Sequence, residues 1–502
     1  MENNVLVLGP IFLPFLGAII ALIFAQNNRL QRIIGLVASI AAWLTACAVL
    51  YQNWDLARSG QTAVQIYRLG NWTPPYGIVL VADMLSALFV VMCTTVLVGG
   101  FLYTLQCKDR CITYPVFLPA FGMMSAAISG AFYTGDIFTL FVFLELMVIS
   151  SVVMVAIADK DLALEAAIKY LLISAMGSLF LLIGIGAVYA SLGTLTMADI
   201  GQLLETGDRP LLARAAAVML TATFLLKSAV FPFHFWQPDF HTTAPTPISA
   251  MLSSIVVKVG VYGVIRLVTL LYRAESGNIG NILIILGIIG IFFGGLAALR
   301  TYDAKRVLAY STFGQVGFIM VGIGWNTPLA MMGALVYAVN HAFIKSALLM
   351  LSGVVASFNQ YKSAKLKDLV GAGKQKIGIG LAYFLGGLAL AGVPPLNGFI
   401  SKLALVRGGV QAQAWISLGL IVGGGLITLL YMTRVYVLIF QQKPTEDTAP
   451  QKEYGDSYLA PALLIAICVL LGLFSAPLVE LARLTVEQLG DPTQYIHSVL
   501  GV

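Results

Sequence analysis

Residues 137–158 read IFTLFVFLELMVISSVVMVAIA, a run that holds a single ionisable side chain, Glu145. A helix needs about 20 predominantly apolar residues to cross the hydrocarbon of a bilayer. Similar runs recur along the whole 502-residue chain, of which 59% is hydrophobic and only 10% charged. This composition excludes an ordinary soluble enzyme, a secreted disulfide scaffold and a disordered protein, because too little polar surface is available.

The apolar runs predict an all-α polytopic membrane protein. Every backbone amide inside a bilayer must be satisfied within its own segment, and the alternating pattern of a membrane barrel is absent. We predict about 14 transmembrane helices, at residues 5–25, 33–51, 80–105, 113–133, 137–158, 166–190, 211–232, 246–272, 279–299, 306–325, 329–356, 377–407, 414–441 and 458–478.

The distribution of lysine and arginine predicts the orientation. Loops after odd-numbered segments hold 15 of the 29 basic residues, whereas the opposite loops and both tails hold 7, Arg209 among them. The richer side, which includes Lys452, should be cytoplasmic. We therefore expect a multi-pass protein of a bacterial inner membrane with both termini on the non-cytoplasmic side.

Seven basic residues remain within or beside the predicted spans, and they carry most of the functional information. A cation at the bilayer centre costs about 2.5–3.5 kcal/mol on insertion scales, so several of them together with Glu145 indicate ion or proton transport. The seven are Lys169, Lys227, Lys258, Arg266, Lys345, Lys402 and Arg434.

Two stretches of the chain repeat one pattern. AAIK ends at Lys169 and AFIK at Lys345, five predicted helices apart, and each lysine follows a polar residue by one helical turn. Lys227 in KSAVFPF and Lys402 in GVPPLNGFISK each lie beside a proline interruption, which opens the helix and frees carbonyl groups. We predict two inverted five-helix repeats, helices 4–8 and 9–13, with broken helices 7 and 12.

The repeats divide the chain into four predicted parts. Residues 1–112 hold helices 1–3, and residues 113–275 form the first repeat with a proton-entry half-channel. Residues 276–441 form the second repeat with a proton-exit half-channel, and residues 442–502 hold a loop, helix 14 and the C-terminal tail.

Glu145 and Lys227 are a candidate proton switch. Burial disfavours the charged form of a lysine and a nearby carboxylate favours it, so moving the two groups relative to each other changes proton affinity. A relay through Lys227, Lys258, His341, Lys345 and Lys402 would continue along the midplane, with water in the longer gaps. The alternative for the pair is a static ion pair that holds two helices together.

Several polar residues stay without an assigned role. Lys169 and Arg434 fit either the relay or the membrane edge, and Arg266 should snorkel from a helix end. His234 and His241 flank a loop that lacks the spacing and the third histidine of a zinc site, so proton collection or turn chemistry is favoured. The five cysteines do not have the spacing of metal ligands, so we expect no metal and no cofactor. The basic residues form no stripe that would bind nucleic acid.

Several stretches of the sequence resemble a known family, the antiporter-like subunits shared by respiratory complex I and Mrp-type multisubunit sodium/proton antiporters. The resemblance rests on FVFLELMVISS around Glu145, FLLKSAVFPFHFWQPDFHTTAPTPISAMLSS around Lys227, DAKRVLAYSTFGQVGFI at 303–319 and NHAFIKSALLM around Lys345. Within that family GNWTPPYGIVLVADMLSALFV and GVPPLNGFISKLALVRGG are most similar to the D-type subunits of the Mrp antiporters.

The resemblance implies functional residues and partners. The family's relay residues fall on Glu145, Lys227, Lys258, His341, Lys345 and Lys402. They imply a proton-translocating subunit that works inside a hetero-oligomeric membrane complex, in which inward proton flux is coupled to extrusion of Na+. Such a subunit is a secondary transporter and not itself an enzyme.

Two other functions stay open. The chain could be a proton-pumping membrane subunit of a complex I-like NAD(P)H or ferredoxin:quinone oxidoreductase or of a membrane-bound hydrogenase, with no redox site of its own. An independent carrier of organic solutes would instead need a central cavity lined by substrate-binding groups. Genes for small antiporter subunits beside this one would favour the antiporter.

Overall fold

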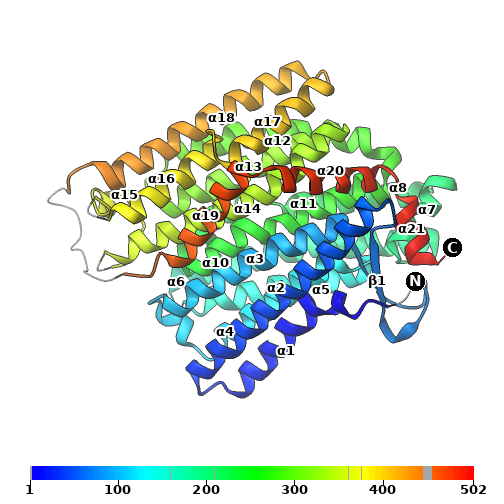
Figure 1. Ribbon diagram of the computed structural model, residues 1–502, viewed down its shortest axis with the longest axis horizontal. Coiled ribbons are helices and arrows are strands. Elements are labelled where there is room, and N and C mark those ends of the chain that lie inside the picture. Colours follow the sequence, from blue (N-terminus) through cyan, green and yellow to red (C-terminus); the bar gives the residue numbers. More distant parts are fainter. Residues whose placement is uncertain are drawn as a thin grey trace.

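The computed structural model shows a bundle of helices, most of which run side by side and obliquely to the longest axis of the molecule (Figure 1). The structure describes residues 3–158, 160–207, 210–359, 361–374, 376–444 and 455–501. Arg209 and Lys452, which entered the orientation argument, lie outside these ranges.

The N-terminal part adds a short hairpin to the predicted helices. Its elements are η1 (Val5–Leu8), α1 (Gly9–Ile23), α2 (Asn28–Arg58), β1 (Val64–Arg68), η2 (Leu69–Asn71), β2 (Val79–Asp83) and α3 (Met84–Gln106). The predicted span 80–105 therefore begins too early, because residues 79–83 pair antiparallel with β1. The Asp83 carboxylate accepts from the Ser86 backbone amide at 2.9 Å and caps α3.

In the middle of the chain, two π-helical turns, η4 and η5, interrupt the regular α-helical geometry. Its elements are η3 (Arg110–Thr113), α4 (Phe117–Tyr133), α5 (Ile137–Ala156), α6 (Asp161–Leu192), α7 (Met197–Thr206), α8 (Leu211–Lys227), α9 (Gln237–Thr243), α10 (Thr246–Met251), η4 (Leu252–Val256), α11 (Val257–Arg266), η5 (Leu267–Leu271) and η6 (Arg273–Glu275). Both η4 and η5 are π-helical, so α10 to η5 form one continuous but irregular segment.

The C-terminal half contains the longest buried helix, α14. Its elements are α12 (Ser276–Arg300), α13 (Ala304–Gly324), α14 (Pro328–Ser357), α15 (Leu366–Leu369), α16 (Ile377–Ala391), α17 (Asn397–Gln411), α18 (Trp415–Tyr436), η7 (Val437–Gln441), α19 (Leu459–Leu473), α20 (Ala476–Gly490) and α21 (Thr493–Leu500).

The fold class is confirmed as a helical polytopic membrane protein. Within the described residues, ten helical segments are long and apolar enough to cross a bilayer, or eleven if α19 and α20, which meet at a 77° bend, form one span. The other three predicted segments are shorter: α4, α8 and the interrupted pair α16 and α17. The count of fourteen spans stays a prediction.

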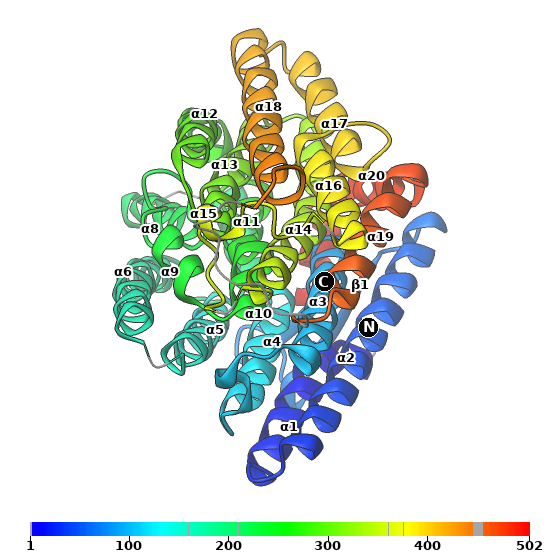
Figure 2. The same cartoon turned by 90° about the vertical axis from the view of Figure 1, so that its left-hand side faces the viewer.

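The core lies around α14 and the segment from α10 to η5. Both segments are completely buried over their most apolar 18 residues, whereas in α2, α6, α12 and α18 fewer than half of the corresponding residues are buried. Figure 2 shows α14 inside the bundle and α1, α6, α12 and α18 at its periphery. Exposed apolar side chains on the outer helices suit lipid, so polar side chains on α11 and α14 are held away from it.

Candidate functional site

Glu145 and Lys227 lie close together, and the Ser178 hydroxyl forms hydrogen bonds with both side chains. The Lys227 ammonium is 3.9 Å from the Glu145 carboxylate. It also donates to the Ser178 hydroxyl at 3.2 Å, and Ser178 donates to Glu145. The Lys227 side chain is only 3% exposed whereas that of Glu145 is 31% exposed, so the carboxylate lies at the outer edge of the group.

The end of α8 positions Lys227. The helix stops at this residue, and Ala229 just beyond it has a positive φ of 53°. Helix α11 packs against the break through Gly260, where a Cβ atom would lie 2.3 Å from the Ser228 hydroxyl oxygen. Glycine is required at this close approach, which brings α11 and Lys258 against the interrupted segment.

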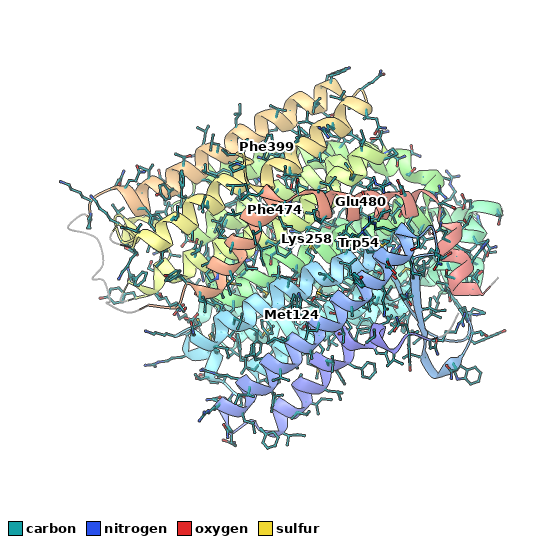
Figure 3. All side chains as sticks on the ribbon, viewed as in Figure 1. Trp54, Met124, Lys258, Phe399, Phe474 and Glu480 are labelled. Carbon is teal, nitrogen blue, oxygen red and sulfur yellow. The ribbon has the colours of Figure 1, made fainter. Side chains whose placement is uncertain are left out.

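Lys258 and His341 form a second buried pair. The lysine ammonium shares a hydrogen bond with Nδ1 of His341, which lies on α14. Lys258 lies in the middle of the molecule (Figure 3), two residues after the end of the π-helical turn η4. Such π-turns occur frequently at functional sites.

Lys345 begins a network of hydroxyl and amide groups. Its ammonium donates to the Ser311 hydroxyl at 2.7 Å, and Ser311 shares a hydrogen bond of 2.7 Å with the Tyr431 hydroxyl. The Gln315 amide donates to Tyr431 at 3.3 Å and to Thr428 at 3.1 Å. Helices α13, α14 and α18 thus meet in a polar layer inside the bundle.

A small cavity adjoins this layer. Its volume is about 10 Å³, and its lining includes Gln315, Tyr337, His341 and Ser401. Tyr337 donates to the Gln315 side-chain oxygen. The cavity is about the size that one water molecule needs, and its polar lining offers that molecule several partners.

Lys402 lies apart from these groups, in the second turn of α17, and its side chain reaches the break between α16 and α17. Its ammonium donates to the Ala391 carbonyl at 2.5 Å and lies 5.5 Å from the centre of the Phe318 ring. Gly392, with φ of 85°, and Gly425 leave room for the side chain. The lysine lines an apolar groove of about 330 Å³. The described residues provide no carboxylate within ion-pair distance of Lys402.

The six predicted site residues therefore fall into four places. Glu145 joins Lys227, Lys258 joins His341, and Lys345 and Lys402 have their own surroundings. No hydrogen bond or ion pair between described residues joins Lys227 to Lys258, or Lys402 to Lys345 directly. Any transfer between these places needs water or side-chain motion.

Sequence reasoning missed the hydroxyl and amide groups between the charged residues. Ser178, Ser311, Gln315, Thr428 and Tyr431 are ordinary residues in apolar helices when taken singly. Their spacing was an available signal, because Ser311 and Gln315 are four residues apart and Thr428 and Tyr431 three apart, which places each pair on one helix face.

The residues left without a role lie in varied surroundings. Lys169 is 48% exposed and pairs with Glu165 and Asp239 at the surface, unlike its buried sequence counterpart Lys345. Arg434 donates to the Leu299 carbonyl and stacks on Tyr302.

The two histidines of the interrupted segment differ from each other. His234 packs against the rings of Phe231, Phe293 and Phe313. Nδ1 of His241 lies 3.0 Å from the Ser249 hydroxyl oxygen, inside the core.

The prediction that Arg266 snorkels from a helix end is wrong. Its guanidinium is buried, lies 2.6 Å from the Asp83 carboxylate and is flanked by the rings of Tyr262 and Tyr495, each 5.0 Å away. The sequence concealed this pair because Asp83 is 183 residues away, at the hairpin that replaces the predicted start of a span.

The fold and the buried titratable groups define a polytopic membrane protein of the ion-translocating kind. The family described as NADH:quinone oxidoreductase/Mrp antiporter, transmembrane, matches residues 134–428, and the chain belongs to it.

Relatives match over nearly the whole chain. The D-type subunit of the Na(+)/H(+) antiporter of Alkalihalophilus pseudofirmus is 32% identical, with 99% of both chains covered. The N-type subunit of the NADH-quinone oxidoreductase of Desulforudis audaxviator is 31% identical over 91% of this chain and 92% of its own. A chain in the structure of the Mrp complex from Dietzia sp. DQ12-45-1b has the same fold, with a TM-score of 0.89, 24% identity and 99% of both chains covered.

Proposed function

We propose that this chain is the proton-translocating subunit of a multisubunit Na+/H+ antiporter, and that it works within a hetero-oligomer in a bacterial inner membrane. Support comes from the name and the full-length match of the Alkalihalophilus antiporter relative. The observation that carries the proposal is the partly buried group Glu145, Ser178 and Lys227, which places an acid and a base on either side of one hydroxyl.

In the proposed route a proton taken up near Lys227 passes to Lys258, His341 and Lys345 and leaves near Lys402. Ser178 holds the carboxylate beside Lys227, so a shift of α5 or α6 changes the stability of the charged lysine. The cavity beside His341 has room for a water molecule that would connect the imidazole to Gln315. Ser311, Tyr431, Gln315 and Thr428 then extend the route from Lys345 toward α18.

The two-repeat organisation fits this route. Residues 113–275 hold Glu145, Lys227 and Lys258, and residues 276–441 hold His341, Lys345 and Lys402. Each half contains one interrupted helix beside a lysine: Lys227 ends the helix before one interruption, and Lys402 lies in the helix after the other. The predicted parts 1–112 and 442–502 would flank these halves.

A second function has its own support in the Desulforudis oxidoreductase relative, whose sequence matches nearly as well. In that case the same residues would pump protons in response to electron transfer in a partner subunit. Copurification separates the two functions, because redox subunits in the purified complex would identify a respiratory assembly.

The test is transport by the purified complex in proteoliposomes. Glu145→Ala and Lys227→Ala should each abolish Na+-dependent proton movement, because each removes one half of the switch, and Lys402→Ala should do the same at the exit. Glu165→Ala, which removes an exposed carboxylate, is the matched control and should transport normally. Normal transport by an assembled Glu145→Ala or Lys227→Ala complex would contradict the assignment.

A further inference from the structure

A cavity outside the relay opens at the end of the molecule that carries α15. Its volume is about 530 Å³, within the range of small-molecule sites. It lies between the loop after α3, the ends of α5 and α14, the α9–α10 connection and the start of α13. Five cationic side chains line it, Lys108, Arg110, Lys160, Lys305 and Lys362, together with a single carboxylate, that of Asp109. We call this cavity the basic basin.

The two carboxylates near the basin, those of Asp109 and Asp456, form ion pairs with Lys362. Lys362 pairs with Asp109 at 2.7 Å and with Asp456 at 2.9 Å. Asp456 is buried and also accepts from the Tyr103 hydroxyl at 2.8 Å and from the Lys108 backbone amide at 3.0 Å. Both carboxylates are therefore bound directly to Lys362.

Three of the lining cations make no direct ion pair with a carboxylate of the described residues. Across the described ranges, no carboxylate lies within ion-pair distance of Arg110, Lys160 or Lys305. Lys305 is only 8% exposed, and its ammonium donates to the Ala244 carbonyl at 3.2 Å. A buried ammonium held by one neutral acceptor is poorly compensated, and like charges around one cavity repel each other.

We propose that the basic basin binds a phosphate group. A phosphate carries up to two negative charges and several acceptor oxygens, so it can pair with Lys305, Arg110 and Lys160 at once. Arg110 offers the two parallel N–H groups that fit phosphate oxygens. Ile157, Ala158 and Pro245 complete the wall with apolar surface. The proposal is independent of the transport assignment, because it concerns binding only.

Free phosphate and the headgroup of an anionic phospholipid share this chemistry, and the test separates them. The purified complex in nanodiscs of phosphatidylcholine is titrated with inorganic phosphate, and binding is followed by calorimetry. A second preparation contains phosphatidylglycerol, and retained lipid is identified by native mass spectrometry. Binding of inorganic phosphate in both preparations assigns the free anion, and retention of phosphatidylglycerol without phosphate binding assigns the headgroup.

Substitutions of the lining cations test whether the anion binds in the basic basin. Lys305→Gln and Arg110→Gln should each weaken the binding that is found by about tenfold, because each removes a charge-assisted hydrogen bond. Lys367→Gln, which neutralises an exposed lysine on α15 that does not line the basin, should leave affinity unchanged. Lys160→Gln, at an exposed position, gives a variant whose folding is not in question.

Two results would overturn the proposal. One is that neither inorganic phosphate nor phosphatidylglycerol associates with the unmodified complex. The other is that affinity is the same in the Lys305→Gln, Arg110→Gln, Lys160→Gln and Lys367→Gln complexes, which would place any bound anion elsewhere.

Discussion

At the scale of single residues, hydroxyl groups link the charged side chains of this protein. Ser178 connects Glu145 to Lys227, and Ser311 connects Lys345 to Tyr431. A hydroxyl both donates and accepts, so it can hold a charged neighbour in either protonation state. Serine and tyrosine are therefore as relevant to the proposed relay as its lysines.

Tyr431→Phe should slow transport while leaving the complex assembled. The change removes the hydroxyl between Ser311 and Gln315 without altering the ring, and a lost hydrogen bond of about 0.5–1.5 kcal/mol corresponds to a decrease of up to about tenfold. The rate of proton movement in proteoliposomes measures the effect. Tyr436→Phe on the same helix, whose ring stacks with Phe440, is the control and should transport normally.

At the scale of elements, ion pairs that are wholly or partly buried fix helix ends that are far apart in the sequence. Asp83 at the start of α3 holds Arg266 at the end of α11, and the ring of Tyr495 on α21 covers the guanidinium. At the opposite end Lys362 joins the loop after α3 to the segment before α19. Both clusters anchor α3, which lies in the buried centre.

Asp83→Asn should lower the free energy of unfolding by about 3–5 kcal/mol, because it leaves the Arg266 cation buried without a partner. Asparagine still caps α3, so the effect isolates the ion pair. The thermal midpoint of the purified protein measures the loss. Asp136→Asn at the start of α5, where the carboxylate caps a helix through Thr139, should cost much less. Equal losses would show that the negative charge at a helix N-terminus, and not the pair with Arg266, accounts for the stabilisation by Asp83.

The Lys362 cluster should stabilise the protein between about pH 4 and pH 10.5. Burial disfavours the charged form of Asp109, but the Lys362 ammonium outweighs it and holds the pKa of Asp109 below its usual 3.8. Burial likewise opposes the Lys362 charge, but Cys107, Asp109 and Asp456 raise its pKa above the usual 10.5. The stabilisation is therefore lost as pH falls below about 3.8 or rises above about 10.5.

The difference in thermal midpoint between the unmodified protein and Lys362→Met checks this window. It should be constant across the middle of the range and shrink at both ends, in buffer that contains no phosphate. A difference that does not change with pH would mean that Lys362 acts through packing alone.

At the scale of the whole molecule, the two ends of the described chain lie at the same end of the bundle (Figure 1). The Asn4 backbone amide donates to the Ile66 carbonyl of β1, and α21 packs against the same strand. The opposite end carries α15 and the basic basin. This arrangement suits the orientation proposed from the loop charges, with both termini outside the cytoplasm.

Cysteine labelling tests that orientation. In a chain whose own cysteines are replaced by alanine, Gln494→Cys should react with a membrane-impermeant maleimide added to intact cells. Lys365→Cys, exposed at the other end, should react only after the cells are opened. The reverse pattern would invert the proposed topology and the direction of the relay.

The sequence alone was sufficient for the fold class and the candidate charged residues. Long apolar runs force helices in a bilayer, and a charge within such a run is costly enough to be conspicuous without any tertiary information. Proline and glycine likewise placed interruptions next to Lys227 and Lys402, since their effect on a helix is local.

Only the tertiary structure decided which of these residues meet. Lys169 and Lys345 follow similar local sequences, yet one lies at the surface and the other in the core. The Arg266–Asp83 pair, the hydroxyl groups around Lys345 and the cations of the basic basin come from segments up to several hundred residues apart. Helical periodicity determines which face of a helix a residue occupies, but the packing of helices determines what that face contacts.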